Sequence, residues 1–218
     1  DDQFVVDVYQ AGAGTSFNMN VNEVLANRAN ELLGARRGTY RFLHPNDHVN
    51  MAQSTNDTIP TAIRLACVMA LPALADSMAR LEAALRRKAR QFGGIVKSGR
   101  THLQDAVPVR LGREFGAYAV AVKKAREAIA CSAEALHELN LGGTAVGTGM
   151  NAHPRYRRLV LQALRRWTHL PVRPAEDLME RMQSAADFAR FSGALRAYAL
   201  ELIRIANDLR LLSSGPNT

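Results

Sequence analysis

Three long stretches of this sequence place apolar residues at helical spacing, and they constrain the fold more than any other feature. They run from Ile63 to Leu85, from Leu111 to Leu136 and from Phe188 to Leu212. Apolar residues that recur every three or four positions give a helix one buried face. Signals for β-strands are almost absent. We therefore predict a mostly α fold, an elongated bundle of long helices that pack at shallow angles.

Glycine and capping residues mark where the helices are expected to begin and end. Thr15 and Ser16 are predicted to cap the first helix, and Gly34 to end it. Residues 54–57 are predicted to cap the second helix. Residues 95–108 lack a helical period and are predicted to form a polar loop. The expected helices are 16–33, a long helix from the 54–57 cap to Gly93–Gly94, 109–138, 154–168 and 178–212.

The composition is that of a folded protein and excludes several other classes. Of 218 residues, 47% are hydrophobic and 22% are charged, which argues against disorder. Charged residues interrupt every long apolar stretch, so no membrane partner is predicted. The chain opens on Asp1–Asp2 without a secretory leader, which favours a cytoplasmic location. The net charge of +8 comes from dispersed basic residues, which indicates solvated faces and no nucleic-acid partner.

Residues typical of metal, nucleotide and serine-hydrolase sites are lacking. Cys67 and Cys131 lie far apart within helical patterns and are predicted to be buried, reduced thiols. No Cys and His residues stand at metal-ligand spacing, so neither a metal nor a cofactor is expected. There is no phosphate-binding or dinucleotide fingerprint and no serine in a nucleophile-elbow context.

Three polar segments, residues 12–20, 44–58 and 99–108, carry the remaining chemical signal. Each is rich in Thr, Ser, Asn or Gly, and the second leads directly into a long helix. Neutral donors at a helix N-terminus suit a small anion, above all a carboxylate whose charge grows during a reaction. His44 and His102 add titratable groups. Taken from the residues alone, a set of ordinary caps and loops remains an equal alternative.

Several long motifs resemble the signature segments of the aspartase/fumarase superfamily, in the same order and over essentially the whole chain. They lie at residues 12–20 with 22–27, 44–57, 99–108, 141–151 and 207–216. The resemblance implies the central helical domain of that fold, which assembles into a homotetramer with composite active sites. It divides the chain into the remainder of an N-terminal lyase domain, residues 1–53, and a truncated central helical bundle, residues 54–218.

The resemblance also implies roles for particular residues. His102 matches the active-site histidine of the family, which relays a proton or orients the substrate. The residues that would bind the substrate carboxylates or the leaving group are Thr15, Ser54, Thr55, Asn56 and Thr101. The resemblance also implies a secondary dicarboxylate site, which would comprise Arg41, His44, Asn46 and Asp47. A purely structural loop is an equally good interpretation of this second group.

The implied reaction removes a Cβ proton and a leaving group from a succinyl skeleton to give fumarate. Ala13, residues 54–57, 174–178 and 207–216 favour the branch that eliminates ammonia from L-aspartate, with the hydration of fumarate to L-malate as the alternative. The family's loop with the catalytic serine is not found before Thr218. The 218 residues alone are therefore expected to be inactive. A third alternative is an inactive helical oligomerisation module.

Overall fold

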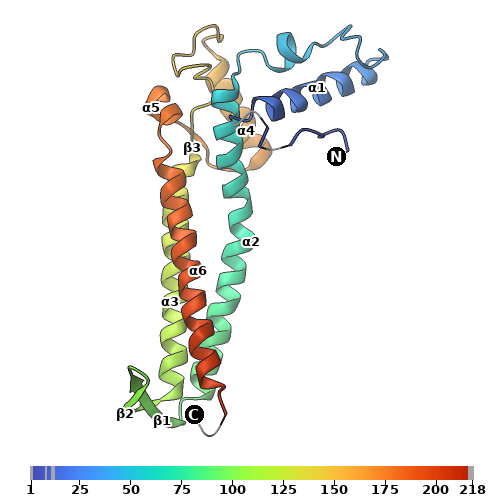
Figure 1. Cartoon of the computed structure of the whole chain (residues 1–218). Coiled ribbons are helices and arrows are strands. Elements are labelled where there is room, and N and C mark those ends of the chain that lie inside the picture. Colours follow the sequence, from blue (N-terminus) through green and yellow to red (C-terminus); the bar gives the residue numbers. More distant parts are fainter. Residues whose placement is uncertain (1, 8, 11–12, 216–218) are drawn as a thin grey trace. The chain divides into compact units, whose positions relative to one another are not determined.

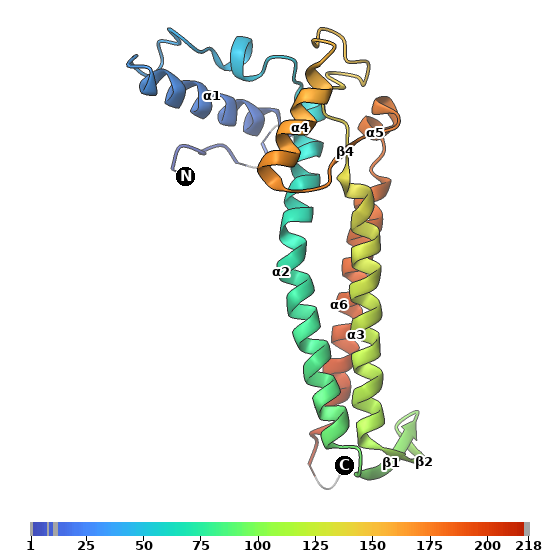
Figure 2. The same cartoon turned by 180° about the vertical axis from the view of Figure 1, so that it is seen from behind.

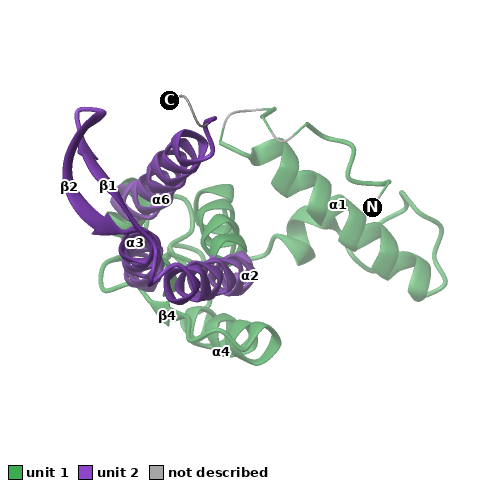
Figure 3. Ribbon diagram, turned by 90° about the horizontal axis from the view of Figure 1, so that it is seen from below, with its two compact units in different colours: residues 1–67, 136–185 green, residues 68–135, 186–218 purple. Residues whose placement is uncertain are grey.

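A computed structural model describes residues 2–7, 9, 10 and 13–215 of the chain. Most of these residues are helical, which confirms the predicted mostly α fold (Figures 1 and 2). Gly12, at the start of the first signature segment, and Pro216, at the end of the last, lie outside the described residues. The chain forms two compact units, which Figure 3 colours separately: unit 1 is residues 1–67 and 136–185, and unit 2 is residues 68–135 and 186–218.

Unit 2 is built from long helices. It contains residues 68–91 of α2 (Thr55–Gln91), and all of α3 (Leu111–Ala133) and α6 (Ala186–Leu212). Within this unit the helices run side by side (Figures 1 and 2). Buried Met78, Val122 and Ile129 lie on the apolar stripes that the sequence predicted. Their burial follows from the helical period, which turns one face of each helix inward.

Close contact between α2 and α3 depends on a glycine. A Cβ atom on Gly112 would lie 2.3 Å from the carbonyl oxygen of Ala89 and 2.9 Å from the backbone nitrogen of Gly93. Both distances are too short for any side chain, so only glycine lets the start of α3 approach the end of α2. The aromatic rings of Phe92 and Phe115 then pack edge to face, with their centroids 5.1 Å apart.

The segment predicted as a polar loop at 95–108 is instead a β-hairpin, so that prediction was wrong. Strand β1 (Val96–Thr101) pairs antiparallel with β2 (Gln104–Arg110), and a register shift follows Gly99. Most of the hairpin is exposed, so its two strands carry no alternation between apolar and polar residues. That alternation is the usual sequence signal of a strand, and its absence explains the error.

The last predicted helix is also divided. The structure has α5 (Leu178–Gln183) and then α6, with the extended residue Ser184 after α5. The predicted 109–138 helix ends earlier, at Ala133, and continues as the 3₁₀ turn η2 (Glu134–His137). The apolar period continues through both places, and a 3₁₀ turn or a two-residue break leaves that period almost unchanged.

Unit 1 has a small apolar core beside helix α4. Helix α4 (Tyr156–Thr168) matches the predicted 154–168 helix. It packs near the short parallel pair β3 (Glu138–Leu139) and β4 (Arg173–Pro174), where Leu139, Leu161 and Val172 are buried.

Helix α1 (Thr15–Leu32) begins differently from the prediction. Its N-cap is Gly14, at a left-handed φ of 83°, and no side chain caps the helix, so the predicted Thr15 and Ser16 cap was wrong. Glycine adopts this conformation without steric cost. The predicted end is confirmed, because Leu33 caps the helix and Gly34 follows with φ 80°.

The two cysteines are free thiols, but they are not buried as predicted. Cys67 is half-buried and Cys131 is exposed. Ile129 and Ala133 face the core of unit 2, and Cys131 lies two residues from each, on the opposite side of a helix with 3.6 residues per turn.

Among the described residues, α2 is the one helix whose length and hydropathy would suffice to cross a membrane. The core helix of a soluble protein meets the same criterion, so this is weak evidence for a span. Arg64, which is fully buried in unit 1, interrupts the apolar stretch. Burial, together with the neighbouring Arg181 charge, lowers the pKa of Arg64 to about 10.

Candidate functional site

The start of α2 is held by a reciprocal cap that confirms the prediction for residues 54–57. The Ser54 hydroxyl accepts a hydrogen bond from the Asn56 backbone N–H at 3.2 Å, and the Asp57 carboxylate accepts one from the Ser54 N–H at 2.9 Å. Two N–H groups that the helix cannot pair internally are satisfied in this way. The cap fixes the backbone at Thr55 and Asn56, the first two residues of α2.

Asp57 also ties this cap to the glycine-rich segment. Its second carboxylate oxygen accepts hydrogen bonds from the backbone N–H groups of Gly142 at 3.1 Å and Thr144 at 2.9 Å. The side chain is fully buried. Burial raises the pKa of Asp57, and the N–H groups of Ser54, Thr144 and Gly142 oppose that rise. Asp57 therefore joins the two segments instead of facing a ligand.

The buried face of α1 meets the start of α2 through asparagines. Asn18 donates a side-chain hydrogen bond to the Thr55 hydroxyl at 3.2 Å, and Asn22 donates one to the Asn50 side chain at 3.1 Å. The Thr58 hydroxyl donates to the Ser54 carbonyl at 2.9 Å, and its oxygen lies 3.4 Å from the Asn18 side-chain oxygen. Asn18 and Asn22 are buried. The polar contact aligns the first two polar segments within unit 1.

The hydroxyls of Ser54 and Thr55 each accept one hydrogen bond, from Asn56 and from Asn18 respectively. No contact within the described part of the chain uses the hydroxyl hydrogen of either residue as a donor. A hydroxyl can donate one hydrogen bond in addition to those that it accepts. Both hydroxyls are therefore orientated by the protein and still able to donate to an anion.

Asn56 is largely committed to the protein. Its side-chain amide donates to the Ala145 carbonyl at 2.9 Å, and its own carbonyl accepts from the Asn140 side chain at 3.1 Å. The residue is exposed, and the second amide hydrogen remains available. Thr15, the first residue of α1, is also exposed, next to the N-cap Gly14. It belongs to unit 1 like Ser54, Thr55 and Asn56.

Thr101 and His102 lie at the tip of the hairpin and belong to unit 2, unlike the other candidate residues. The turn is formed by His102 at φ 50° and Leu103 at φ 61°. Two successive positive φ values describe the turn that most readily joins two twisted strands, and Asn-Gly is its usual sequence. Histidine and leucine there are strained, and both side chains are exposed.

Three residues of the proposed secondary site belong to a short π-helix, η1 (Pro45–Val49), or to its cap. Asn46 and Asp47 lie in the helix, and His44 is its N-cap. The Nδ1 atom of His44 accepts from the backbone N–H groups of Asn46 and Asp47, both at 3.3 Å. The same Nδ1 lies 3.4 Å from the Asp47 carboxylate. An ion pair would require a proton on Nδ1, which the two N–H donors oppose. Nδ1 of His44 therefore serves as the hydrogen-bond acceptor that caps η1.

The remaining member of that group, Arg41, lies over the ring of Phe42, with its guanidinium carbon 5.2 Å from the ring centroid. Arg41, Asn46 and Asp47 are exposed, and His44 is half-buried. The π-helix is a rare element that occurs often at functional sites, but here its cap uses His44 structurally. Across the described residues, no group of three or more His, Cys, Asp or Glu side chains could hold a metal ion.

Three residues that position the site were not predicted: Asn18, Asn22 and Asn140. Asn18 and Asn22 belong to a stripe with a spacing of four that continues through Ala26 and Asn30. That spacing marks one helix face, and the stripe could have been recognised as a polar face in contact with backbone groups. Asn140, which donates to the Asn56 carbonyl, has no comparable pattern around it.

Comparison with known proteins identifies relatives over the whole length of the chain. A family model described as lyase matches residues 1–218. An aspartate ammonia-lyase from Helicobacter pylori is 49% identical over 215 residues, which cover 99% of this chain and 46% of that protein.

Solved structures show the same fold. A fumarate lyase:delta crystallin from Brucella melitensis, in a crystal structure with bound cobalt, superposes with a TM-score of 0.97 at 48% identity and covers all of this chain and 47% of its own. A class II fumarase from Schistosoma mansoni superposes with a TM-score of 0.92 at 37% identity and covers all of this chain and 49% of its own. The chain thus spans about half the length of the proteins that it matches.

Proposed function

This chain belongs to the lyase family, and from that membership we propose that the intact protein eliminates ammonia from L-aspartate to give fumarate. The observation that carries the proposal is the 49% identity to an aspartate ammonia-lyase across 99% of the chain, which includes all three polar segments. The likeness to a class II fumarase is lower, at 37% identity. Hydration of fumarate to L-malate is therefore the second candidate.

In the proposed reaction, a base removes a proton from Cβ, and the neighbouring carboxylate acquires additional negative charge until ammonia departs. Groups that bind this intermediate more tightly than the substrate accelerate the reaction. The hydroxyls of Ser54 and Thr55 suit this role, because each is already orientated by an accepted hydrogen bond and can still donate one. Neutral donors of this kind stabilise the added charge without neutralising the substrate beforehand.

We assign the remaining substrate contacts to Thr15, Asn56 and Thr101, and a proton-relaying or orienting role to His102. Asn56 would use its second amide hydrogen, since the first is bound to the Ala145 carbonyl. Thr101 and His102 would contribute from an exposed hairpin tip. Exposure of both suits residues that are covered only when substrate and neighbouring segments are present.

We further propose that the active sites are composite and form in a homotetramer. Large apolar side chains remain exposed on the long helices, among them Met69 at 61%, Leu200 at 56% and Ile203 at 56%. An uncovered apolar face on a long helix is typical of a surface that packs against another helix. A cytoplasmic location and the division at residue 53 are part of the same proposal, as is a secondary dicarboxylate site at Arg41, His44, Asn46 and Asp47.

The test measures fumarate formation by ultraviolet absorbance with the intact protein, once with L-aspartate and once with L-malate. We expect activity with L-aspartate. Activity with L-malate alone would overturn the assignment in favour of the fumarase reaction, and activity with neither would exclude both. The 218-residue chain tested alone is expected to be inactive, because the family's general base is not identified within it.

Two substitutions test the residue assignments in the intact protein. We expect Thr55→Val to lower kcat/KM by about 10- to 100-fold and Thr55→Ser to restore most of it, because serine keeps the donor. His102→Ala should lower kcat while the neighbouring Leu103→Ala, as the matched control, does not. Loss of the oligomer in His102→Ala, measured by sedimentation, would show that this histidine has a structural role instead.

A further inference from the structure

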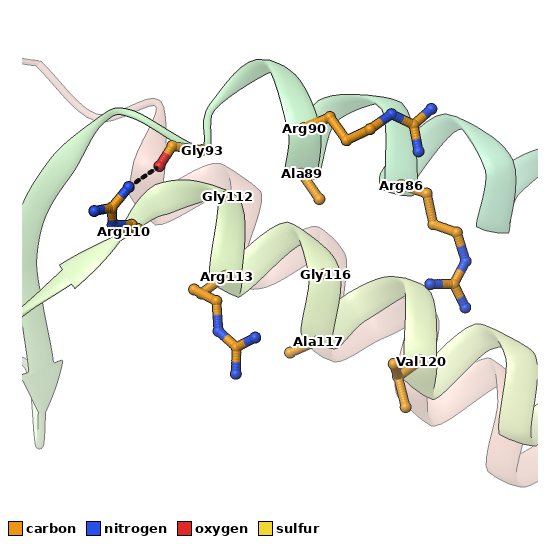
Figure 4. Close-up of a pocket in the computed structure, with 10 residues that line it drawn as sticks. All are labelled: Arg86, Ala89, Arg90, Gly93, Arg110, Gly112, Arg113, Gly116, Ala117 and Val120. Carbon is orange, nitrogen blue, oxygen red and sulfur yellow. Dashed lines mark hydrogen bonds between the residues drawn. The ribbon is translucent and has the colours of Figure 1, made fainter.

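A cavity lies within unit 2, where the end of α2 meets the start of α3 (Figure 4). Its volume is about 470 Å³, which falls in the range of pockets that hold small molecules. None of the candidate substrate residues lines it. Figure 4 shows the lining side chains, which come from α2, from the last residue of β2 and from α3.

Four of the lining residues are arginines: Arg86, Arg90, Arg110 and Arg113. The rest of the lining is small or apolar, and no carboxylate contributes to it among the described residues. Arginines from three elements therefore line one cavity, and among the described residues Arg86 is the one of the four that is paired with a carboxylate, that of Glu82. The composition of the pocket thus indicates an anionic ligand.

The arginines retain most of their hydrogen-bonding capacity. Arg86 pairs with Glu82 through Nη2 at 2.8 Å, and Arg110 donates through Nη1 to the Gly93 carbonyl at 3.0 Å, as the dashed line in Figure 4 marks. Within the described ranges, neither Arg90 nor Arg113 has an ion pair with a carboxylate. A guanidinium group has five N–H donors, so the side-chain donors of both Arg90 and Arg113 remain for a ligand.

The small residues explain how a cavity forms between the elements that carry the arginines. Gly112 permits the close approach of α3 to α2, as described above. Gly116, one turn further along α3, leaves the space between the helices open, and a Cβ atom there would lie 3.9 Å from the Ala89 side chain. The cavity therefore exists because glycine and alanine replace larger side chains at this crossing.

The chemistry of the lining favours phosphate over carboxylate. A phosphate ester carries nearly two negative charges and three terminal oxygens, and arginine binds such groups through two parallel N–H···O bonds. A single carboxylate would leave most of four guanidinium groups unmatched. We propose that this pocket, which we call the arginine pocket, binds a small phosphorylated anion through Arg86, Arg90, Arg110 and Arg113. The proposal stands independently of the elimination reaction.

The experiment is calorimetric titration of the intact protein with sodium pyrophosphate, ADP and inorganic phosphate, at constant ionic strength. Sodium sulfate and sodium succinate serve as anion controls. We expect a saturable site for pyrophosphate or ADP that is tighter than the site for succinate. The ratio between ADP and pyrophosphate separates a nucleotide from a simple polyphosphate. Equal weak binding of every anion would overturn the proposal and indicate a general charge effect.

Two arginine variants locate the site. Arg90→Gln and Arg113→Gln should each weaken pyrophosphate binding by about tenfold, the effect of one charged hydrogen bond. Arg87→Gln removes the same charge from an exposed position of α2 outside the pocket and is the matched control. An equal loss in Arg87→Gln would show that net charge, and not the pocket, binds the anion.

A steric variant keeps all four arginines. Gly116→Leu places a side chain in the cavity and should abolish the saturable binding, while far-ultraviolet circular dichroism confirms that the helices remain. If the leucine variant does not fold, Gly116→Ala provides the same test with a smaller expected loss. Unchanged affinity in a folded Gly116 variant would contradict binding within the cavity.

Discussion

The two units stabilise their parts of the candidate site by different interactions. In unit 1, the start of α2 is fixed by buried polar groups, above all Asp57 with its three backbone N–H donors and Asn18 beside Thr55. In unit 2, buried apolar side chains such as Met78 and Ile129 hold the helices together. The hairpin that carries His102 is exposed and makes few contacts of its own.

Buried hydrogen bonds in unit 1 and apolar packing in unit 2 suit the different roles that we propose for the two units. Donors that stabilise a growing charge must be orientated before the reaction, and buried hydrogen bonds provide direction that apolar contacts cannot. Apolar packing has no direction but tolerates long, regular helices. The hairpin tip, which we propose contacts the substrate, is exposed. The following substitutions test the contrast, beginning with the largest expected effect.

Asp57→Ala should have the largest effect of these substitutions, and it should destabilise unit 1. It leaves the N–H groups of Ser54, Gly142 and Thr144 without their acceptor in a buried environment. We expect a loss of about 3–5 kcal/mol in the free energy of unfolding, measured with urea. Asp76→Ala, at an exposed position of the same helix, should change it by less than about 0.5 kcal/mol. Similar values for the two variants would contradict the polar anchoring of unit 1.

Met78→Ala tests the apolar packing of unit 2. Its side chain is 1% exposed, and we expect a loss of about 2–4 kcal/mol from the lost contacts and the cavity that remains. Met69→Ala, on the same helix at 61% exposure, is the control. A comparable loss in Met69→Ala within the intact protein would indicate that another copy of the chain covers this face.

Glu82→Gln measures the small electrostatic contribution within unit 2. Glu82 pairs with Arg86 at 2.8 Å and with Arg126 at 3.1 Å, and these arginines lower its pKa from the usual 4.5. A lowered pKa stabilises the folded state above the unfolded pKa, and this contribution is lost as the pH falls through the folded pKa.

The expected effect of Glu82→Gln is therefore about 1 kcal/mol at pH 7, and it should be lost as the pH falls below 4.5 and through the lowered pKa of Glu82. Urea denaturation at several pH values checks this. Glu127→Gln affects an exposed pair with Lys123 at 3.5 Å and should cost less than about 0.5 kcal/mol. An effect of Glu82→Gln that is independent of pH would show that packing, and not charge, is responsible.

Leu103→Gly should have the smallest effect, and it should be stabilising. Leu103 has φ 61° in the hairpin turn, and its side chain is 72% exposed, so little packing is lost. Relief of the left-handed conformation should raise the free energy of unfolding by about 0.5–1 kcal/mol. Leu103→Ala keeps the strain and should not stabilise. A loss of stability in the glycine variant would show that the leucine side chain makes a contact that matters.

The mostly α fold, the presence of the long helices and the Ser54–Asp57 cap followed from the sequence, because helical period and capping are local properties. The signature motifs likewise indicate the family, because each is a continuous run of residues. The hairpin at 96–110, the break after α5 and the exposure of Cys131 did not follow. Each depends on what a segment packs against, and the local pattern does not contain that information.

The polar segment before α2 shows the same division between local and tertiary causes. Its hydroxyls and its position at a helix N-terminus could be recognised from the sequence, and they indicated an anion site. Only the tertiary structure decided which side chains are available to a ligand. The Asp57 carboxylate accepts hydrogen bonds from Gly142 and Thr144, and the Asn56 side chain donates to Ala145. Among the described residues, Ser54 and Thr55 donate their hydroxyl hydrogens to no other group. Partners more than 80 positions away in the chain make that difference, so no local pattern could predict it.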